Sequence, residues 1–317
     1  MSKNQSISKI SLILVFCKKI CALLVLQVLL YNNCMCAHQL GYSKPGFEFI
    51  NAADKKYLEL FFRIFFLNDD FSYTLFGDKP MSFSGIPKQS LEPSHLIQCL
   101  SDISGSLSMG KAAEIFKKYR KIINPKYIFV FNENSEDVFI YFINKESFLK
   151  SIDENIDIFI KELGEDFTPI AFLDEVLKEK RPLLEIIHHH EGILGILLGY
   201  GRHNALLFQQ KADILGRCWG YGEVIKQGGV TYSTTLDLDS KVKELEYLDN
   251  KLGFFSQENE YSELVPVAPL GFGADYGHPE TKILKEKYTV LRKQINTAYS
   301  KANPFQVIWN MLIDIVD

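Results

Sequence analysis

The stretch KYIFVFNENSEDVFIYFI, residues 126–143, carries the strongest strand signal in this chain. Two apolar runs, residues 126–131 and 138–143, flank a polar segment, and both are rich in the β-branched and aromatic residues that favour strands. Each run is apolar at consecutive positions, whereas a strand with one solvated face alternates apolar and polar residues. The stretch therefore predicts two antiparallel strands with both faces covered.

The residues before this pair combine a buried helix with further strands. The segment DKKYLELFFRIFFLNDD, residues 54–70, is apolar on nearly every side between polar ends, which is typical of a helix in a core. Residues 71–85, FSYTLFGDKPMSFSG, are expected to form two short strands around a turn at residues 77–80. Asp78 and Lys79 in this turn are predicted to be solvated; the alternative is a functional pair at a hairpin tip.

Helical periodicity replaces the strand pattern after Lys145. One apolar stripe ends at Gly164, a second helix is predicted to start at Thr168 and Pro169, and a third at Pro279. The stripe residues of the first and third helices are Phe148, Ile152, Ile156, Phe159 and Leu163, and Leu284, Tyr288, Leu291, Ile295 and Ala298. Antiparallel strands mainly in the first half and a helix-rich second half predict an α+β fold, with residues 38–317 as a single compact domain.

The first 37 residues differ in composition from the rest of the chain. They contain Lys3, Lys9, Lys18 and Lys19 but no acidic residue, and residues 20–30, ICALLVLQVLL, are apolar apart from one glutamine. A basic start followed by an apolar run of about 7–15 residues is typical of a signal peptide. We therefore expect an exported protein, periplasmic or secreted; the alternative is an uncleaved segment that anchors the chain in the inner membrane.

Without residues 1–37 the chain is acidic. Removing four lysines from 35 basic residues leaves 31 against 39 acidic residues, a formal charge of −8. This charge argues against nucleic acid as a partner, and membrane contact is expected only through the N-terminal segment if it is uncleaved. Cys99 and Cys218 remain after residue 37, either as one disulfide or as two thiols.

Three blocks spread over most of the mature chain carry a resemblance to a known family. They are FFRIFFLNDDFSYTLFGDKPMSF (residues 61–83), GILLGYGRHNALLF (residues 195–208) and PLGFGADYGHPETKILKEKY (residues 269–288). In these blocks the chain resembles a family of uncharacterised bacterial proteins that usually carry an N-terminal export signal. The resemblance supports a single unit and implies no activity, cofactor or catalytic residue.

The segment EIIHHHEG, residues 185–192, contains candidate metal ligands. On a helix, Glu185 and His189 lie four residues apart and His188 and Glu191 three apart, so either pair would supply two ligands from one face. Neither H-E-x-x-H nor H-x-x-E-H is present, and a zinc site needs further ligands from distant residues. The favoured interpretation is that these histidines cap a helix or form hydrogen bonds within it, so no cofactor is predicted. The alternative is that they bind zinc.

The segment GYGRHN is a candidate anion site. Its candidate residues are Gly199, Gly201, Arg202, His203 and Asn204. The two glycines permit a tight turn, and the asparagine is expected to cap a helix that ends at Gly216. Free N–H groups at the helix start, with the arginine and histidine beside them, would bind a phosphate or carboxylate. The alternative is structural packing, in which the arginine pairs with an acid of the chain.

Three glycines precede this loop at helical spacing. Gly192, Gly195 and Gly199 are three and four residues apart, which places them on one face of a helix. A glycine inside a helix costs about 1 kcal/mol relative to alanine, so close approach of another backbone is expected to offset the loss.

These patterns predict an exported binding or interaction protein whose functional surface includes residues 199–204. An effector is one form that such a protein takes. The expected partner is an unknown protein or a small anionic ligand. The competing hypothesis is a metal-dependent hydrolase that uses His188 or His189 with Glu185 or Glu191. No G-x-S-x-G elbow is present to support serine chemistry.

Overall fold

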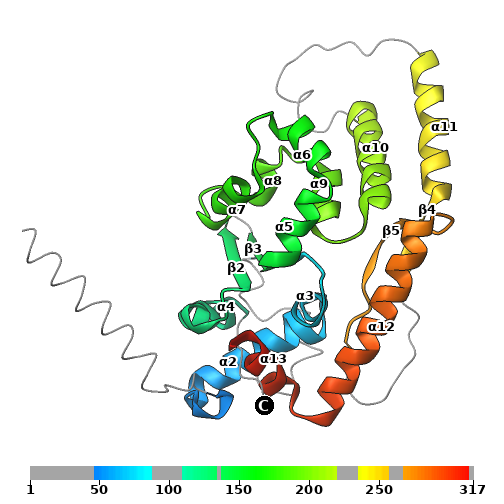
Figure 1. The fold of residues 1–317 in the computed structure, drawn as a ribbon. Coiled ribbons are helices and arrows are strands. Elements are labelled where there is room, and N and C mark those ends of the chain that lie inside the picture. The colour runs from blue at the N-terminus through cyan, green and yellow to red at the C-terminus, as the bar shows by residue number, and fades with distance from the viewer. Residues whose placement is uncertain (1–45, 88–108, 134–136, 220–234, 257–266, 314–317) are drawn as a thin grey trace, which may run out of the picture. The chain divides into compact units, whose positions relative to one another are not determined.

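Three strands in the first half of the chain form an antiparallel sheet. The computed structural model describes residues 46–87, 109–133, 137–219, 235–256 and 267–313. The strands are β1 (Met81–Pro87), β2 (Tyr127–Glu133) and β3 (Asp137–Asn144), with β3 in the middle (Figure 1). In the register of β2 and β3, Phe129 pairs with Phe142 and Val130 with Tyr141. The predicted antiparallel pair is therefore confirmed.

The two faces of this sheet contact two separate groups of buried residues. On β3, Ile140 and Phe142 belong to one group and Tyr141 and Ile143 to the other, because successive side chains of a strand point to opposite faces. Helices α2 (Ala52–Phe62), α3 (Phe71–Phe76) and α13 (Pro304–Ile313) contribute to the first group, and α5 (Lys145–Asp153) and α9 (Glu191–Leu197) to the second. The expectation that both faces are covered is confirmed.

Aromatic rings dominate the first group. The ring of Phe129 lies 4.4 Å from that of Phe142, and the ring of Phe61 lies 4.1 Å from that of Phe116 in α4 (Met109–Tyr119). Helix α2 continues directly into a π-helical turn, η2 (Arg63–Leu67), in which Phe65, Phe66 and Leu67 are buried. The prediction of a core helix in this segment is confirmed.

Residues 71–76 form helix α3, so the prediction of a strand there is wrong. Every residue from Phe71 to Leu75 is buried. Polar and apolar positions alternate in the sequence, but the alternation does not separate an inner from an outer face when all sides are covered. A helix satisfies its backbone hydrogen bonds internally, and the Ser72 hydroxyl adds a bond to the Phe66 carbonyl at 2.6 Å.

Helices make up most of the second half. The remaining helices and short helical turns among the described residues are η1 (Phe47–Phe49), η5 (Arg120–Ile122), α6 (Ile156–Leu163), α7 (Pro169–Leu177), α8 (Leu183–Ile186), α10 (Arg202–Trp219), α11 (Thr235–Lys251) and α12 (Pro279–Lys301). Strands β4 (Leu252–Ser256) and β5 (Gly271–Asp275) form a second antiparallel pair. The α+β class is confirmed.

Most of the predicted helix ends agree with the structure. Gly164 follows α6 with a φ of 109°, Thr168 caps α7 by accepting a hydrogen bond from the Ala171 amide, and α12 begins at Pro279. The single stripe predicted for residues 148–163 is divided between α5 and α6, since buried Asn155 interrupts the helix and donates back to the Ser151 carbonyl at 2.8 Å.

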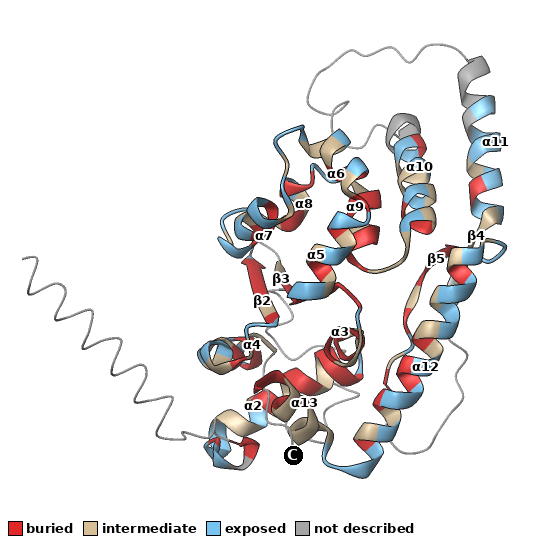
Figure 2. Cartoon of the chain, viewed as in Figure 1, coloured by how far each residue is buried: buried red, intermediate tan, exposed pale blue. Residues whose placement is uncertain are grey.

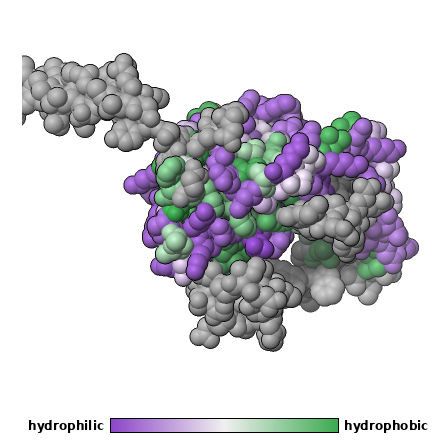
Figure 3. Space-filling model, turned by 90° about the horizontal axis from the view of Figure 1, so that it is seen from below, coloured by the Kyte–Doolittle hydropathy of each residue, from purple (hydrophilic) through white to green (hydrophobic). Residues whose placement is uncertain are grey.

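In most of the helices, buried residues gather on one side and exposed residues on the other (Figure 2). On the face seen in Figure 3, hydrophilic and hydrophobic side chains are interspersed. None of the helices within the described ranges is long and apolar enough to cross a membrane. The expected signal peptide, residues 1–37, and Cys99 lie outside the described residues, as does the side chain of Cys218.

Candidate functional site

A glycine-containing loop joins α9 to α10. Gly199 and Gly201 have φ angles of 75° and 84°, a region that side chains rarely adopt. A Cβ atom at Gly199 would lie 2.7 Å from the Tyr288 hydroxyl, and one at Gly201 would lie 2.7 Å from the Glu280 carboxyl carbon. The Tyr288 hydroxyl also donates to the Gly199 carbonyl at 2.8 Å. Both glycines are therefore required by conformation and by space, and the loop is held against α12.

Helix α10 begins at Arg202, so the prediction that Asn204 caps it is wrong. The amides of Arg202 and His203 donate to the two carboxylate oxygens of Glu280 at 2.9 and 2.7 Å. A carboxylate of this chain thus occupies the helix start, where the exposed N–H groups and the helix dipole favour an anion. The helix also continues past Gly216 to Trp219, contrary to the predicted end, because glycine lowers helix propensity without terminating a helix.

Asn204 has a structural position instead. It is buried, and its side-chain amide donates to the Tyr200 carbonyl at 2.9 Å. Its side-chain oxygen accepts from the Asp275 amide at 2.9 Å and from the Thr281 hydroxyl at 3.0 Å. Asn204 therefore ties α10 to β5 and to α12 by one hydrogen bond each, and a third bond joins it to the loop.

Arg202 and His203 both contact acids of the chain. Arg202 donates two hydrogen bonds to the Asp157 carboxylate, at 2.7 and 2.6 Å, and both side chains are exposed. His203 Nε2 donates to Asp275 at 2.9 Å, and its ring stacks on that of His278 with centroids 3.5 Å apart. The hydrogen bond from His203 holds the pKa of Asp275 below its usual value. The five candidate anion-site residues thus lie together, and the donors of Arg202 and His203 contact carboxylates within the same chain.

A pocket of about 350 Å³, here called the loop pocket, lies beside this loop. Its charged lining residues are Asp78, Lys150, Glu154, Arg202, Glu280 and Lys287. The lysines come from α5 and α12 and the arginine from α10, and each has an acidic partner at the surface. Lys287 lies 2.7 Å from Asp78 and Lys150 lies 3.8 Å from Glu154. Such solvated pairs contribute about 0–1 kcal/mol each, so a ligand can replace the acidic partner at low cost.

The candidate metal residues do not share a helical face. Helix α8 ends at Ile186 and α9 starts at Glu191, and between them His188 and His189 have φ angles of 53° and 56°. Glu185, His188 and His189 are exposed. His190 caps α9, since its Nδ1 accepts from the Ile193 amide at 3.0 Å. Within the described ranges, no group of three or more His, Cys, Asp or Glu side chains is placed to hold a metal ion.

Of the three glycines at helical spacing, Gly195 has the predicted close approach of another backbone, that of Ala205. Gly195 lies in α9, and a Cβ atom added to it would lie 2.9 Å from the Cβ of Ala205 in α10. Gly192 has equally little room, but the neighbours are side chains: such an atom would lie 2.9 Å from the His190 ring and 3.2 Å from the Gln209 Cβ. Gly199 lies outside the helix, in the loop, so the prediction that all three glycines share one helical face is wrong.

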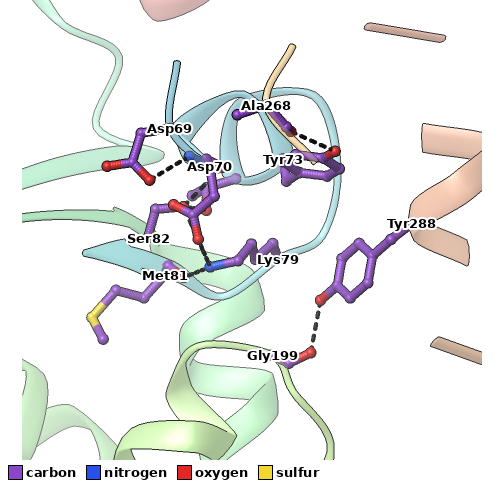
Figure 4. A network of polar contacts seen from close by, with 10 residues as sticks. Asp69, Asp70, Tyr73, Lys79, Met81, Ser82, Gly199, Ala268 and Tyr288 are labelled. Carbon is purple, nitrogen blue, oxygen red and sulfur yellow. Dashed lines mark hydrogen bonds and ion pairs between the residues drawn. The ribbon is translucent and has the colours of Figure 1, made fainter. Parts of the chain in front are cut away.

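A buried ion pair lies beneath the loop, and sequence reasoning missed it. Lys79 is fully buried, so the prediction of a solvated turn residue is wrong. Its ammonium group lies 3.0 Å from Asp70 Oδ2 and donates to the Met81 carbonyl and, at 3.4 Å, to the Ser82 hydroxyl (Figure 4). The aliphatic part of Lys79 passes under the loop, 3.5 Å from the position of a Cβ on Gly199.

Burial shifts the pKa values of these charged groups. Burial lowers the pKa of Lys79, while the Asp70 carboxylate opposes that effect. The pKa of Asp69 is raised to about 6, first by burial and then by the neighbouring Asp70 carboxylate. One signal in the sequence pointed here: two adjacent acids follow a predicted core helix rich in phenylalanine, and a lysine occurs nine residues after the second acid. The turn residues around the lysine, which usually mark solvated segments, concealed it.

No protein family, curated protein or solved structure was found to match this chain.

Proposed function

We propose that this chain is an exported binding protein whose loop pocket takes a small anionic ligand. The observation that carries the proposal is the convergence of three cationic side chains, from α5, α10 and α12, on one pocket beside a rigid glycine loop. Arg202 is suited to bidentate binding of a carboxylate or phosphate, and Lys150 and Lys287 supply point charges at the same pocket. The chemistry that unites the candidate ligands is a phosphate or carboxylate group.

The proposal explains why the loop is fixed. A site for a small ligand gains affinity when its groups are already in place, because less conformational freedom is lost on binding. Two glycines with left-handed φ angles, the Tyr288 hydrogen bond and the Glu280 carboxylate hold the loop in one conformation. The buried Lys79 adds a rigid support beneath it.

The ligand proposal is tested by calorimetry and thermal unfolding of the purified full-length chain with inorganic phosphate and with citrate. A ligand at 100 times its dissociation constant stabilises the folded state by about 2.7 kcal/mol. Arg202→Gln, Lys150→Gln and Lys287→Gln are each expected to weaken binding about tenfold, since each removes a charged partner of the ligand.

Lys285→Gln is the matched control, because Lys285 is an exposed lysine of α12 that does not line the pocket. It is expected to bind phosphate and citrate as the unchanged chain does. The proposal would be contradicted if the chain bound neither phosphate nor citrate. It would also be contradicted if the affinity were unchanged in all three pocket variants.

The export part of the proposal rests on the composition of residues 1–37 and on the resemblance to exported bacterial proteins. We expect the chain recovered from an expressing bacterium to lie outside the cytoplasm and to have lost a segment of about 15–30 residues or slightly more. Fractionation followed by intact-mass measurement checks this. An intact chain in the cytoplasmic fraction would exclude export, and an intact chain in the membrane fraction would support the anchored alternative.

A further inference from the structure

The loop between α9 and α10 separates the loop pocket from a second pocket. Gly199, Gly201 and Arg202 line the loop pocket, whereas Leu198, Tyr200 and Asn204 line the other one. This second pocket, here called the apolar pocket, has a volume of about 190 Å³ and lies between α9, α10 and β5. Glu191, Leu194, Phe208 and Phe272 are among its other lining residues.

Packing around the apolar pocket leaves space that the chain does not fill. The close contact of Gly195 with Ala205 fixes the distance between α9 and α10. On the opposite wall, Phe272 is flanked by two glycines, and its ring stacks on Tyr200 with centroids 4.5 Å apart. A Cβ atom on Gly273 would lie 3.7 Å from the Phe208 ring, an ordinary contact distance. A side chain would therefore fit at residue 273, and the glycine leaves that volume open.

Glu191 is the one charged residue among the lining residues of this pocket, most of which are apolar. Glu191 lines the apolar pocket and is partly buried, and within the described ranges nothing donates a hydrogen bond to its carboxylate or forms an ion pair with it. Burial raises the pKa of Glu191, which the nearby His189 and His190 partly oppose. A carboxylate withdrawn from water without a counter-ion is unfavourable, and a cation brought by a ligand would relieve this.

We propose that the apolar pocket binds a small amine, an ammonium group attached by a short arm to a single hydrophobic ring. The ring contacts Leu194, Leu198 and Phe208, and the ammonium group pairs with Glu191. An apolar cavity of about 150 Å³ is known to hold benzene, so 190 Å³ accommodates one ring and a short arm. This site is separate from the proposed anion site, and the two take ligands of opposite charge.

The test uses titration of the full chain with phenethylamine, followed by calorimetry and by ligand-observed NMR. Phenylpropionate has the same ring with the opposite charge, and ethylbenzene has no charge. We expect phenethylamine to bind more tightly than ethylbenzene and phenylpropionate not to bind. Glu191→Gln should lower the affinity for phenethylamine about tenfold and leave the affinity for ethylbenzene unchanged, since only the amine uses the carboxylate.

Two further variants separate the pocket from nonspecific effects. Gly273→Ala places a methyl group in the pocket wall. It should lower the affinity for both phenethylamine and ethylbenzene, by about tenfold for a contact of this size. Glu185→Gln removes an exposed glutamate that lies outside the pocket lining, so it should change neither of the two affinities.

Two results would overturn the inference. The first is the absence of phenethylamine binding, and the second is phenethylamine affinity that is the same in Glu191→Gln as in the unchanged chain. Neither result bears on phosphate or citrate binding at the loop pocket, so failure of this inference is distinguishable from failure of the proposed function.

Discussion

Lys79→Met is expected to lower the free energy of unfolding by about 3–5 kcal/mol, because it leaves the Asp70 carboxylate partly buried without its cation. Asp70 is already poorly satisfied, since Oδ1 is buried and has no hydrogen-bond partner. Methionine fills a volume similar to that of the lysine stem, so the lost charge is the main change. Chemical denaturation monitored by circular dichroism measures the effect.

The double variant Lys79→Met with Asp70→Asn tests this cause. Removing both charges should recover part of the lost stability, because replacing a buried ion pair as a whole costs far less than removing one partner. Lys287→Met is the matched control: Lys287 pairs with the exposed Asp78, so its loss should cost about 0–1 kcal/mol. If Lys79→Met were as mild as Lys287→Met, the buried pair would not stabilise the fold.

Asp69→Asn is expected to stabilise the protein at pH 7 but not at pH 3.5. The pKa of Asp69 is raised to about 6 in the folded state from 3.8, so the folded state binds its proton more tightly than the unfolded state. The stability contributed by protonated Asp69 is complete below pH 3.8 and is lost as the pH rises through about 6. One pKa unit corresponds to about 1.4 kcal/mol, and after allowance for partial exposure we expect a difference of about 1–2 kcal/mol.

The measurement is the difference in unfolding free energy between Asp69→Asn and the unchanged chain at several pH values from 3.5 to about 7. This difference should grow between pH 4 and 6 and then remain constant. Asp157→Asn is a control of opposite sign, because the hydrogen bond from Arg202 lowers the pKa of Asp157 and its contribution is lost as the pH falls. A difference for Asp69→Asn that is independent of pH would show that Asp69 is not held protonated by the fold.

The strand pair and the helices with clear periodicity were predictable from local patterns. The runs around residues 126–143 are apolar at consecutive positions, and β2 and β3 are covered on both faces. Three helix ends were predictable because they depend on a property of a single residue. Thr168 has a side-chain acceptor, Gly164 has a permissive backbone and Pro279 has a fixed φ.

Segments buried on all sides were not predictable in the same way. Residues 71–76 alternate like a strand and form α3, because in a fully enclosed segment the choice between helix and strand depends on the neighbours. Lys79 lies in a typical turn sequence and is nevertheless fully buried, because Asp70 and the Met81 carbonyl lie within reach of its ammonium group.

The loop between α9 and α10 has one feature that was predictable from the sequence and one that was not. Two glycines spaced by one residue permit left-handed φ angles, so the sharp turn at residues 199–201 was predictable from the sequence, as was the presence of candidate donors for an anion beside it. The groups that those donors contact could be learned from the folded structure alone: Glu280 at the helix amides, Asp157 at Arg202 and Asp275 at His203. The physical reason is that backbone conformation depends on local sterics, whereas an ion pair depends on which distant segments the folded chain brings within about 3 Å of each other.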